Sequence, residues 1–237
     1  MVTSETMRLA MPLLQPSQAQ KHVTVNEALM RLDGLVNLVL QSVSTLLPPA
    51  TVIDGQCWGV PLAAQGAWAG KDGLIALGSN GGWMFVAPSA GMRAFVADRG
   101  CEAIHDGRGW ALGALSLGVF GSGLVAGFAE AEVMVGTGAD FDTGLAIPAN
   151  VSVIGAVARV TETLTGGLTS WRLGHGGATN RFGQGLGTSA GSWARGLLGT
   201  PTAYYSPETM VMTAEGGNFS GGAVRLSVHW LELRLPF

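Results

Sequence analysis

Charged side chains are scarce in this chain of 237 residues, because they make up only 12% of it, about half of the ~25% usual for soluble proteins. The formal net charge at pH 7 is −3, so the chain lacks the basic surplus by which proteins neutralise nucleic-acid phosphates. We therefore expect no nucleic-acid partner. So few charges suit a protein that covers much of its surface in an assembly, or an all-β fold with many tight turns.

Cysteine and histidine are also too sparse for several kinds of site. Cys57 and Cys101 cannot form a disulfide framework; we expect two buried reduced thiols, with a single pairing as the alternative. The histidines lie too far apart for any zinc-ligand spacing: His22, His105, His175 and His229. No phosphate loop or dinucleotide fingerprint is present, so the sequence predicts no metal and no cofactor.

Targeting and membrane signals are weak. The N-terminus has no basic segment followed by an apolar one, so we expect no signal peptide and assembly in the cytoplasm. Residues 111–129 contain no charge, but they hold five glycines, which would weaken a membrane-spanning helix by up to about 1 kcal/mol each. We expect a glycine-rich extended linker over residues 111–130 and no membrane insertion.

One long segment near the start has the pattern of a helix. Thr24 and Glu27 form a capping-box pair, and Pro48 with Pro49 would end the helix after Leu47. Apolar residues recur in alternating steps of four and three, which is a heptad seam: Val25, Leu29, Leu32, Val36, Val39, Val43 and Leu46. We expect residues 1–49 to be an extended segment and a helix for docking or oligomerisation; packing on the helix's own domain is the alternative.

Residues 50–110 read as a small β module rich in glycine and tryptophan. Four glycine turns adjoin the aromatic residues Trp58, Trp68, Trp83 and Trp110. Residues 74–77, 83–86 and 92–96 read as strands, and hairpin turns are indicated at 80–81 and 106–107. The tryptophans could stack on sugars, but filling the core of a small sheet is the favoured interpretation.

Residues 131–237 read as an all-β domain. Residues 132–135 and 151–160 are expected strands, and residues 166–199 are expected to form loops and short strands. Apolar residues alternate from Val224 to Trp230, and the alternation then changes parity at Leu231, which predicts a β-bulge or a change of neighbouring strand. The expected fold is mainly β, with an N-terminal helix, the tryptophan-rich module and a C-terminal β-sandwich or jelly-roll-like domain.

The N-terminal half carries a family resemblance. Residues 18–29 (QAQKHVTVNEAL) and 31–33 (RLD), then 66–70 (GAWAG), 82–91 (GWMFVAPSAG) and 106–110 (DGRGW), together resemble a domain of unknown function. That domain occurs in alphaproteobacterial phages and gene transfer agents. The resemblance covers about residues 10–110.

The C-terminal half is similar to the receptor-facing ends of phage tail fibres and spikes. The matching phrases are 147–150 (IPAN), 169–174 (TSWRLG), 180–183 (NRFG) and 213–226 (TAEGGNFSGGAVRL). The two resemblances imply a virion surface component, such as a gene transfer agent head spike, that binds host capsular polysaccharide. They imply a homo-oligomer, with a trimer favoured and a pentamer as the alternative, that contacts a capsid or tail protein and a second spike protein.

Two patterns could indicate an enzyme. Residues 187–191 fit the G-x-S-x-G formula around Ser189, but glycine-rich flanks do not supply the strand and helix that the formula needs. Glu130 with Glu132, and Asp140 with Asp142, would face the same side of a strand, as the paired carboxylates of a glycosidase must. Turn-forming aspartates beside glycine are the commoner explanation, so we expect no enzyme; a glycan hydrolase or deacetylase and a purely structural adaptor are the alternatives.

Glycan contacts are expected from aromatic and planar polar residues in the last domain. Aromatic faces cover the C–H side of a sugar, and arginine and asparagine hydrogen-bond to its hydroxyl or carboxylate groups. The candidates are Trp171, His175, Asn180, Arg181, Trp193, Tyr204 and Tyr205. Trp171 and Phe182, which short strands flank, are equally candidates for the core.

Overall fold

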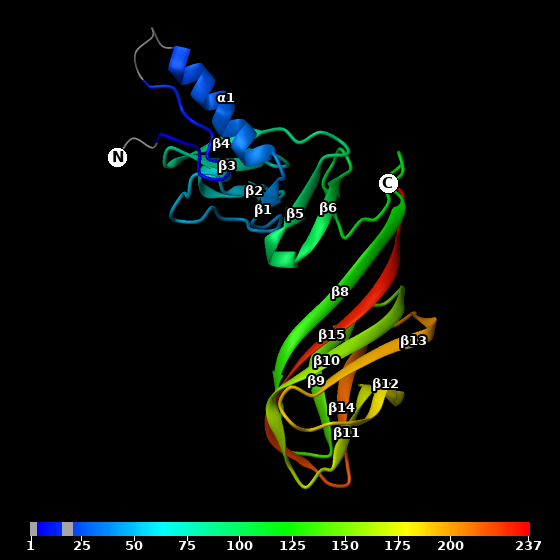
Figure 1. The fold of residues 1–237 in the computed structure, drawn as a ribbon. Coiled ribbons are helices and arrows are strands. Elements are labelled where there is room, and N and C mark those ends of the chain that lie inside the picture. Colours follow the sequence, from blue (N-terminus) through cyan, green and yellow to red (C-terminus); the bar gives the residue numbers. More distant parts are fainter. Residues whose placement is uncertain (1–3, 16–20) are drawn as a thin grey trace. The chain divides into compact units, whose positions relative to one another are not determined.

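The structure is a computed structural model that describes residues 4–15 and 21–237. The chain divides into two compact units, residues 1–121 and 122–237. The regular structure of the chain is mainly β-strand, with an α-helix near the start of the chain (Figure 1), which confirms the predicted fold class. Residues 18–20 of the family-like block lie outside the described residues. Within the predicted linker, the residues from Gly123 onward belong to a paired strand.

Unit 1 forms one mixed sheet with a helix. Its elements are α1 (Lys21–Leu35), β1 (Val39–Leu40), β2 (Cys57–Gly59), a 3-10 helix (Gly66–Trp68), β3 (Ile75–Ser79), β4 (Gly82–Val86), β5 (Arg93–Val96), a 3-10 helix (Ala97–Arg99), β6 (Cys101–His105) and β7 (Trp110–Leu112). The strand order is β4-β3-β2-β1-β5-β6-β7. Strand β1 lies in the segment predicted for docking, residues 1–49, but it pairs in parallel with β2 and β5 of the predicted module 50–110. Residues from both predicted segments therefore belong to this sheet.

Helix α1 is shorter than predicted. It ends at Leu35, so the expected helix to Leu47 is wrong. Its bounds, Lys21–Leu35, place Thr24 inside the helix, so Thr24 does not cap its start. Asn37 has a φ of 48°, a left-handed conformation that ends helices. Leu38, Leu40 and Ser42 are then buried at every second position, which is the period of a strand.

Gly34 explains how closely the helix approaches the sheet. A Cβ atom at this position would lie 2.6 Å from Cδ1 of Leu77 and 3.2 Å from Sγ of Cys57. Leu77 is fully buried in the unit 1 core, so it has little room to move. The glycine therefore allows the last turn of α1 to lie directly on strand β3.

The tryptophans of unit 1 are core residues, as favoured from the sequence. Trp68 is fully buried, and its ring lies 5.8 Å from that of Trp58 and 5.2 Å from that of Trp83. Trp110 packs edge-on against His105, with ring centroids 5.0 Å apart. The predicted hairpins are also confirmed, since residues 80–81 and 106–109 join consecutive paired strands.

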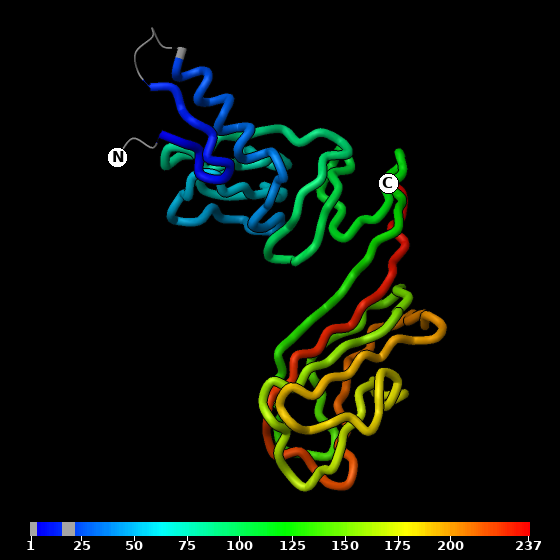
Figure 2. The backbone as a smooth tube through the Cα atoms, in the orientation of Figure 1, coloured from blue at the N-terminus to red at the C-terminus, as the bar shows by residue number. Residues whose placement is uncertain are grey.

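Unit 2 is a β-sandwich, as predicted. Its strands are β8 (Gly123–Met134), β9 (Asp140–Ile147), β10 (Val151–Gly166), β11 (Ser170–His175), β12 (Ala178–Leu186), β13 (Trp193–Tyr204), β14 (Glu208–Glu215) and β15 (Phe219–Arg234). They form two four-stranded sheets, in the orders β13-β10-β15-β8 and β12-β11-β14-β9. Strands β8 and β15 are far apart in the sequence but run side by side (Figure 2).

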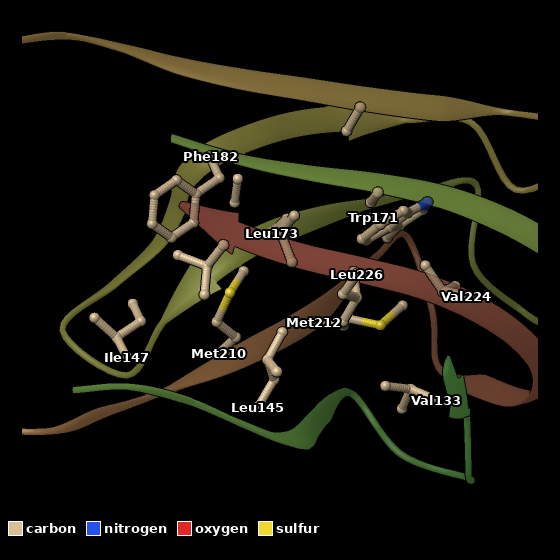
Figure 3. Close-up of a cluster of buried hydrophobic side chains, with 14 of the residues drawn as sticks. Val133, Leu145, Ile147, Trp171, Leu173, Phe182, Met210, Met212, Val224 and Leu226 are labelled. Carbon is tan, nitrogen blue, oxygen red and sulfur yellow. The ribbon is translucent and has the colours of Figure 1, made fainter. Parts of the chain in front are cut away.

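The core of unit 2 lies between these two sheets. Figure 3 shows Trp171 and Leu173 of β11 beside Met210 and Met212 of β14, facing Leu226 of β15. Alternate residues of each strand enter this layer, as expected where two sheets pack face to face. The solvent-facing side chains of β10 and β15 consequently point away from the sandwich.

The change of parity near Trp230 coincides with a bulge in the neighbouring strand. Strand β15 pairs with β8 without interruption from Ala223 to Arg234. Its pairing with β10 shifts between Val153 and Gly155, opposite Trp230 and His229. The predicted irregularity is therefore present at this level of the sheet, but the extra residue belongs to β10.

Candidate functional site

The outer face of the sheet β13-β10-β15-β8 carries the most distinctive surface of unit 2. On β10, Val157 and Arg159 are solvent-exposed, whereas Ala158 between them is buried. On β13, Trp193 and Arg195 are exposed on either side of buried Ala194. Because successive side chains in a strand face opposite sides, these four residues lie on the face turned away from the core.

The strand register brings these residues together. Arg159 lies opposite both Trp193 of β13 and Arg225 of β15, and Val157 lies opposite Arg195. Residues directly opposite each other in antiparallel strands have Cβ atoms about 4.5–5.5 Å apart. With one acidic side chain from β8 they line an open hollow of about 540 Å³. We call this set the outer-face patch: Glu130, Val157, Arg159, Trp193, Arg195 and Arg225.

The charges of the patch are unequally neutralised. Nε of Arg225 lies 3.3 Å from Oε1 of Glu132 on β8. The guanidinium carbon of Arg195 lies 5.8 Å from the centre of the Trp193 ring, a cation–π contact. Within the part of the chain that the structure describes, neither Arg159 nor Arg195 forms an ion pair with a carboxylate.

Three of the predicted glycan-binding residues are buried instead. Trp171 is 1% exposed, and its Nε1 donates a hydrogen bond to the carbonyl oxygen of Gly187 at 3.0 Å. His175 and Tyr204 are also buried, with their rings 5.3 Å apart and edge to face. Burial raises the pKa of the Tyr204 hydroxyl. These side chains fill the sandwich core because they fall on the inward parity of their strands, so none presents a face to solvent.

The other predicted residues are exposed but do not form one group. Asn180 and Arg181 lie on β12, where Nδ2 of Asn180 donates to Oε1 of Gln184 at 3.1 Å. Trp193 is 63% exposed at the start of β13, and Tyr205 is 84% exposed just after its end. Of the predicted set, Trp193 belongs to the outer-face patch. Arg159 and Arg195 were not among the residues predicted from the sequence. The available signal for Arg159 was its place between Ala158 and Val160, small apolar residues that are buried.

The two aspartates that suggested an enzyme, Asp140 and Asp142, have structural partners. Oδ1 of Asp140 accepts a hydrogen bond from the Thr213 hydroxyl at 2.6 Å. Oδ1 of Asp142 accepts from the amide of Gly144 at 2.8 Å, the turn-forming role of an aspartate before glycine. Ser189 lies in a turn between strands β12 and β13, so the strand–turn–helix context that activates such a serine is not formed there.

Neither thiol is part of a described metal cluster. Among the described residues, no group of three or more His, Cys, Asp or Glu side chains could hold a metal ion. Cys57 and Cys101 are both free, which agrees with the expected reduced state, but only Cys57 is buried, since Cys101 is half-buried. Burial raises the pKa of the Cys57 thiol to about 11. No helix in the described part of the chain has the length and apolar character to cross a membrane.

The predicted docking seam is divided by the early end of α1. Val25, Leu32 and Val36 are exposed and Leu29 is half-buried, so they form an apolar stripe along the helix and its last turn. The other predicted residues leave this surface: Val39 is in β1, Val43 packs on the unit 1 core and Leu46 lies in a loop. The continuous helical seam predicted through Leu46 is therefore wrong beyond Val36.

Two polar residues of α1 fasten the preceding segment to the helix. Asp33 is fully buried, and its carboxylate accepts hydrogen bonds from the Thr6 hydroxyl and the Leu9 amide, both at 2.7 Å. The Asn26 side chain accepts from the amide of Leu14 at 2.8 Å and donates to its carbonyl oxygen at 3.0 Å. These two positions of the family-like block thus have a structural role that the sequence pattern did not reveal.

Comparison with known proteins gives a family match for only part of the chain. No curated protein matches it. A chain of the Cyanophage Pam1 capsid asymmetric unit is similar, with 18% sequence identity and a TM-score of 0.35, covering 50% of this chain and 91% of that chain. That degree of likeness establishes neither a common fold nor a common function. Residues 25–111, which include most of α1 and the sheet of unit 1, match the domain described as a protein of unknown function, DUF2793.

Proposed function

We propose that this protein is a non-enzymatic spike or fibre component of a phage-like particle, and that unit 2 attaches the particle to a cell-surface polysaccharide. The observation that carries the proposal is the solvent-exposed indole of Trp193, which has the Arg195 guanidinium beside its ring and Arg159 directly opposite it on β10. The DUF2793 match over residues 25–111 supports the resemblance that suggested a particle component. A gene transfer agent head spike is the form of particle component that the resemblance favours.

The outer-face patch has the chemistry that a polysaccharide requires. The flat face of an indole can cover the C–H side of a sugar ring, and arginines donate hydrogen bonds to its oxygens. The hollow of about 540 Å³ is open along a sheet face, so a long polymer could cross it without its ends entering a closed pocket. Val157 lies beside these polar groups and supplies an apolar floor.

The attachment role is tested by binding of the full chain to purified capsular polysaccharide from the host cell. We expect Trp193→Ala to weaken binding by about tenfold, because covering about 55 Å² of ring is worth roughly 1.4 kcal/mol. Tyr205→Ala is the matched control, since Tyr205 is 84% exposed and lies outside the patch. Equal affinity of the wild type and Trp193→Ala would contradict the assignment of this surface; no binding at all would favour the structural adaptor.

In this function, unit 1 mediates oligomerisation or docking on the particle. The apolar stripe of Val25, Leu29, Leu32 and Val36 is only partly covered by the residues that the structure describes. Covering it in a homo-oligomer, or against a capsid or tail protein, would remove apolar surface from water. A trimer remains the favoured oligomer and a pentamer the alternative.

A further inference from the structure

In the outer-face patch, Arg225 is paired with a carboxylate, but in the described part of the chain Arg159 and Arg195 are not. This difference indicates which class of polysaccharide the patch binds. We infer that the patch selects an acidic saccharide, whose oxyanion is held by Arg159 and Arg195 while its ring lies on Trp193. This inference rests on the proposed attachment function and adds the charge of the ligand to it. The oxyanion can belong to a carboxylate or to an acidic ester, since the arginine fork fits both.

Arg159 is the first element of the argument. It lies directly opposite Arg225 in the paired strands, and like charges in this position destabilise a sheet. Arg225 is compensated by Glu132 at 3.3 Å, but no carboxylate in the described part of the chain pairs with Arg159. A bound anion would relieve this repulsion and would use the donors of Arg159 that point to solvent.

Arg195 and Trp193 indicate where on the patch a sugar would lie. The guanidinium of Arg195 lies 5.8 Å from the Trp193 ring centre, and Arg159 is the cross-strand neighbour of that same tryptophan. Two arginines therefore adjoin one exposed aromatic residue, one through a ring contact and one through the strand register. A sugar that stacks on the indole would bring a substituent within reach of both positive charges.

The acidic residues lie at the far edge of the same sheet. Strand β8, which carries Glu130 and Glu132, is separated from β13 by β10 and β15, and three strand spacings amount to roughly 14 Å. The carboxylate of Glu132 already has two partners, Nε of Arg225 and the Thr161 hydroxyl, each at 3.3 Å from its Oε1 atom. The positive charges of Arg159 and Arg195 are therefore on the β13 side of the patch, where an anion would bind.

The test compares charged and neutral forms of one polymer. The full chain is titrated with polygalacturonate, with the same polymer after its carboxyl groups are reduced to alcohols, and with dextran sulfate and neutral dextran. We expect each charged polymer to bind at least about fivefold more tightly than its neutral counterpart, a ratio corresponding to about 1 kcal/mol. This preference should shrink as salt rises from 0.05 to about 0.5 M.

Single variants assign the preference to the patch. Arg159→Ala and Arg195→Ala should each remove most of the preference for the charged polymer, because they should weaken its binding much more than that of its neutral counterpart. Arg181→Ala is the matched control, because Arg181 is exposed on β12, in the other sheet. Equal binding of charged and neutral polymers, or a preference that survives in Arg159→Ala and Arg195→Ala, would overturn the inference.

Attachment through the patch and the preference for acidic saccharides are distinguished by different results. If Trp193→Ala weakens binding of both polymer forms while the arginine variants change nothing, attachment through the patch stands and the selection of acidic saccharides falls. If neither polymer form binds, the selection of acidic saccharides falls, whereas the attachment function falls only if purified capsular polysaccharide also fails to bind. A preference for dextran sulfate without one for polygalacturonate would identify the acidic group as an ester.

Discussion

Arg8 and Asp33 each bind the backbone of the other. The Asp33 carboxylate accepts a hydrogen bond from the amide of Arg8 at 3.1 Å, and the Arg8 guanidinium donates to the carbonyl oxygen of Asp33 at 2.6 Å. The same guanidinium also binds the carbonyl oxygens of Gly34 and Asn37, at 2.8 and 2.7 Å. The residues before α1 therefore satisfy the carbonyl groups that the end of the helix leaves free.

Removing the Asp33 carboxylate should destabilise unit 1 selectively. Asp33→Ala leaves the amides of Arg8 and Leu9 and the Thr6 hydroxyl without their acceptor, which should cost about 3 kcal/mol. Hydrogen exchange followed by mass spectrometry should show faster exchange in α1 and β3 with no change in the sandwich of unit 2. Arg31→Ala is the control, because its exposed ion pair with Glu27 at 3.0 Å is worth at most about 0.5 kcal/mol. Equal effects of the two substitutions would show that this network does not anchor the segment.

Gly34→Ala should destabilise unit 1 although alanine favours helix formation. In an open helix the change would gain up to about 1 kcal/mol, but here the new methyl group would meet Leu77 at 2.6 Å. Overpacking of this kind costs about 1–3 kcal/mol. Gly82→Ala is the matched control, since the nearest atom to a Cβ there is 3.8 Å away. Urea unfolding measures both, and a Gly34→Ala protein as stable as the wild type would contradict the close approach of helix and sheet.

Glu215 should make unit 2 less stable in acid. Its pKa is held below the usual value of 4.5, first by the hydrogen bond from the Ser170 hydroxyl at 2.6 Å and then by the amide of Gly185 at 3.0 Å and the charge of Arg172. A depressed folded-state pKa means that this stabilisation is complete above the unfolded-state pKa and is lost as pH falls through the folded-state value.

The contribution of Glu215 is isolated by the difference between the wild type and Glu215→Gln. Thermal unfolding should show the wild type more stable at pH 7, with the difference shrinking as the pH falls below 4.5. The substitution retains the size of the side chain, so packing changes little. A difference that stays constant from pH 7 to pH 3 would show that the carboxylate charge is not responsible.

Leu32→Asp should prevent assembly without unfolding the protein. Leu32 is 50% exposed on the apolar stripe of α1, so a charge there costs little in the isolated chain but is unfavourable in a covered interface. Mass photometry should show loss of the oligomer, and circular dichroism should remain that of the wild type. Thr24→Asp places the same charge on another exposed position of the helix and should assemble normally. Assembly of Leu32→Asp at wild-type concentrations would remove the stripe from the interface.

Local patterns in the sequence were sufficient for several features of the fold. The turn at Asn80 and Gly81 was predictable because both residues tolerate the positive φ, 52° and 73°, that a two-residue hairpin needs. The core position of Phe182 and the alternation of β15 follow from the period of a strand. The end of α1 had one local signal, Asn37, whose φ is 48°, but its other support, the hydrogen bonds from Arg8, comes from a residue distant in the sequence.

The candidate site was only partly accessible from the sequence for a related reason. Trp193 was predicted to contact a glycan because it is aromatic, and it is exposed. Trp171 and Tyr204 were predicted for the same reason but are buried. What separates them is the parity of each residue within its strand. Arg159 and Arg195 come from different strands and meet only through the register of β10 with β13, which no local pattern specifies.

Hydroxyl-radical footprinting of the full chain with and without the bound polysaccharide tests the central claim most directly. The side chain of Trp193, 63% exposed in the free protein, should be oxidised several times more slowly when the polysaccharide is bound. Tyr205, at 84% exposure and outside the patch, should be oxidised at an unchanged rate. Unchanged oxidation of Trp193 in the presence of bound polysaccharide would contradict attachment through the outer-face patch.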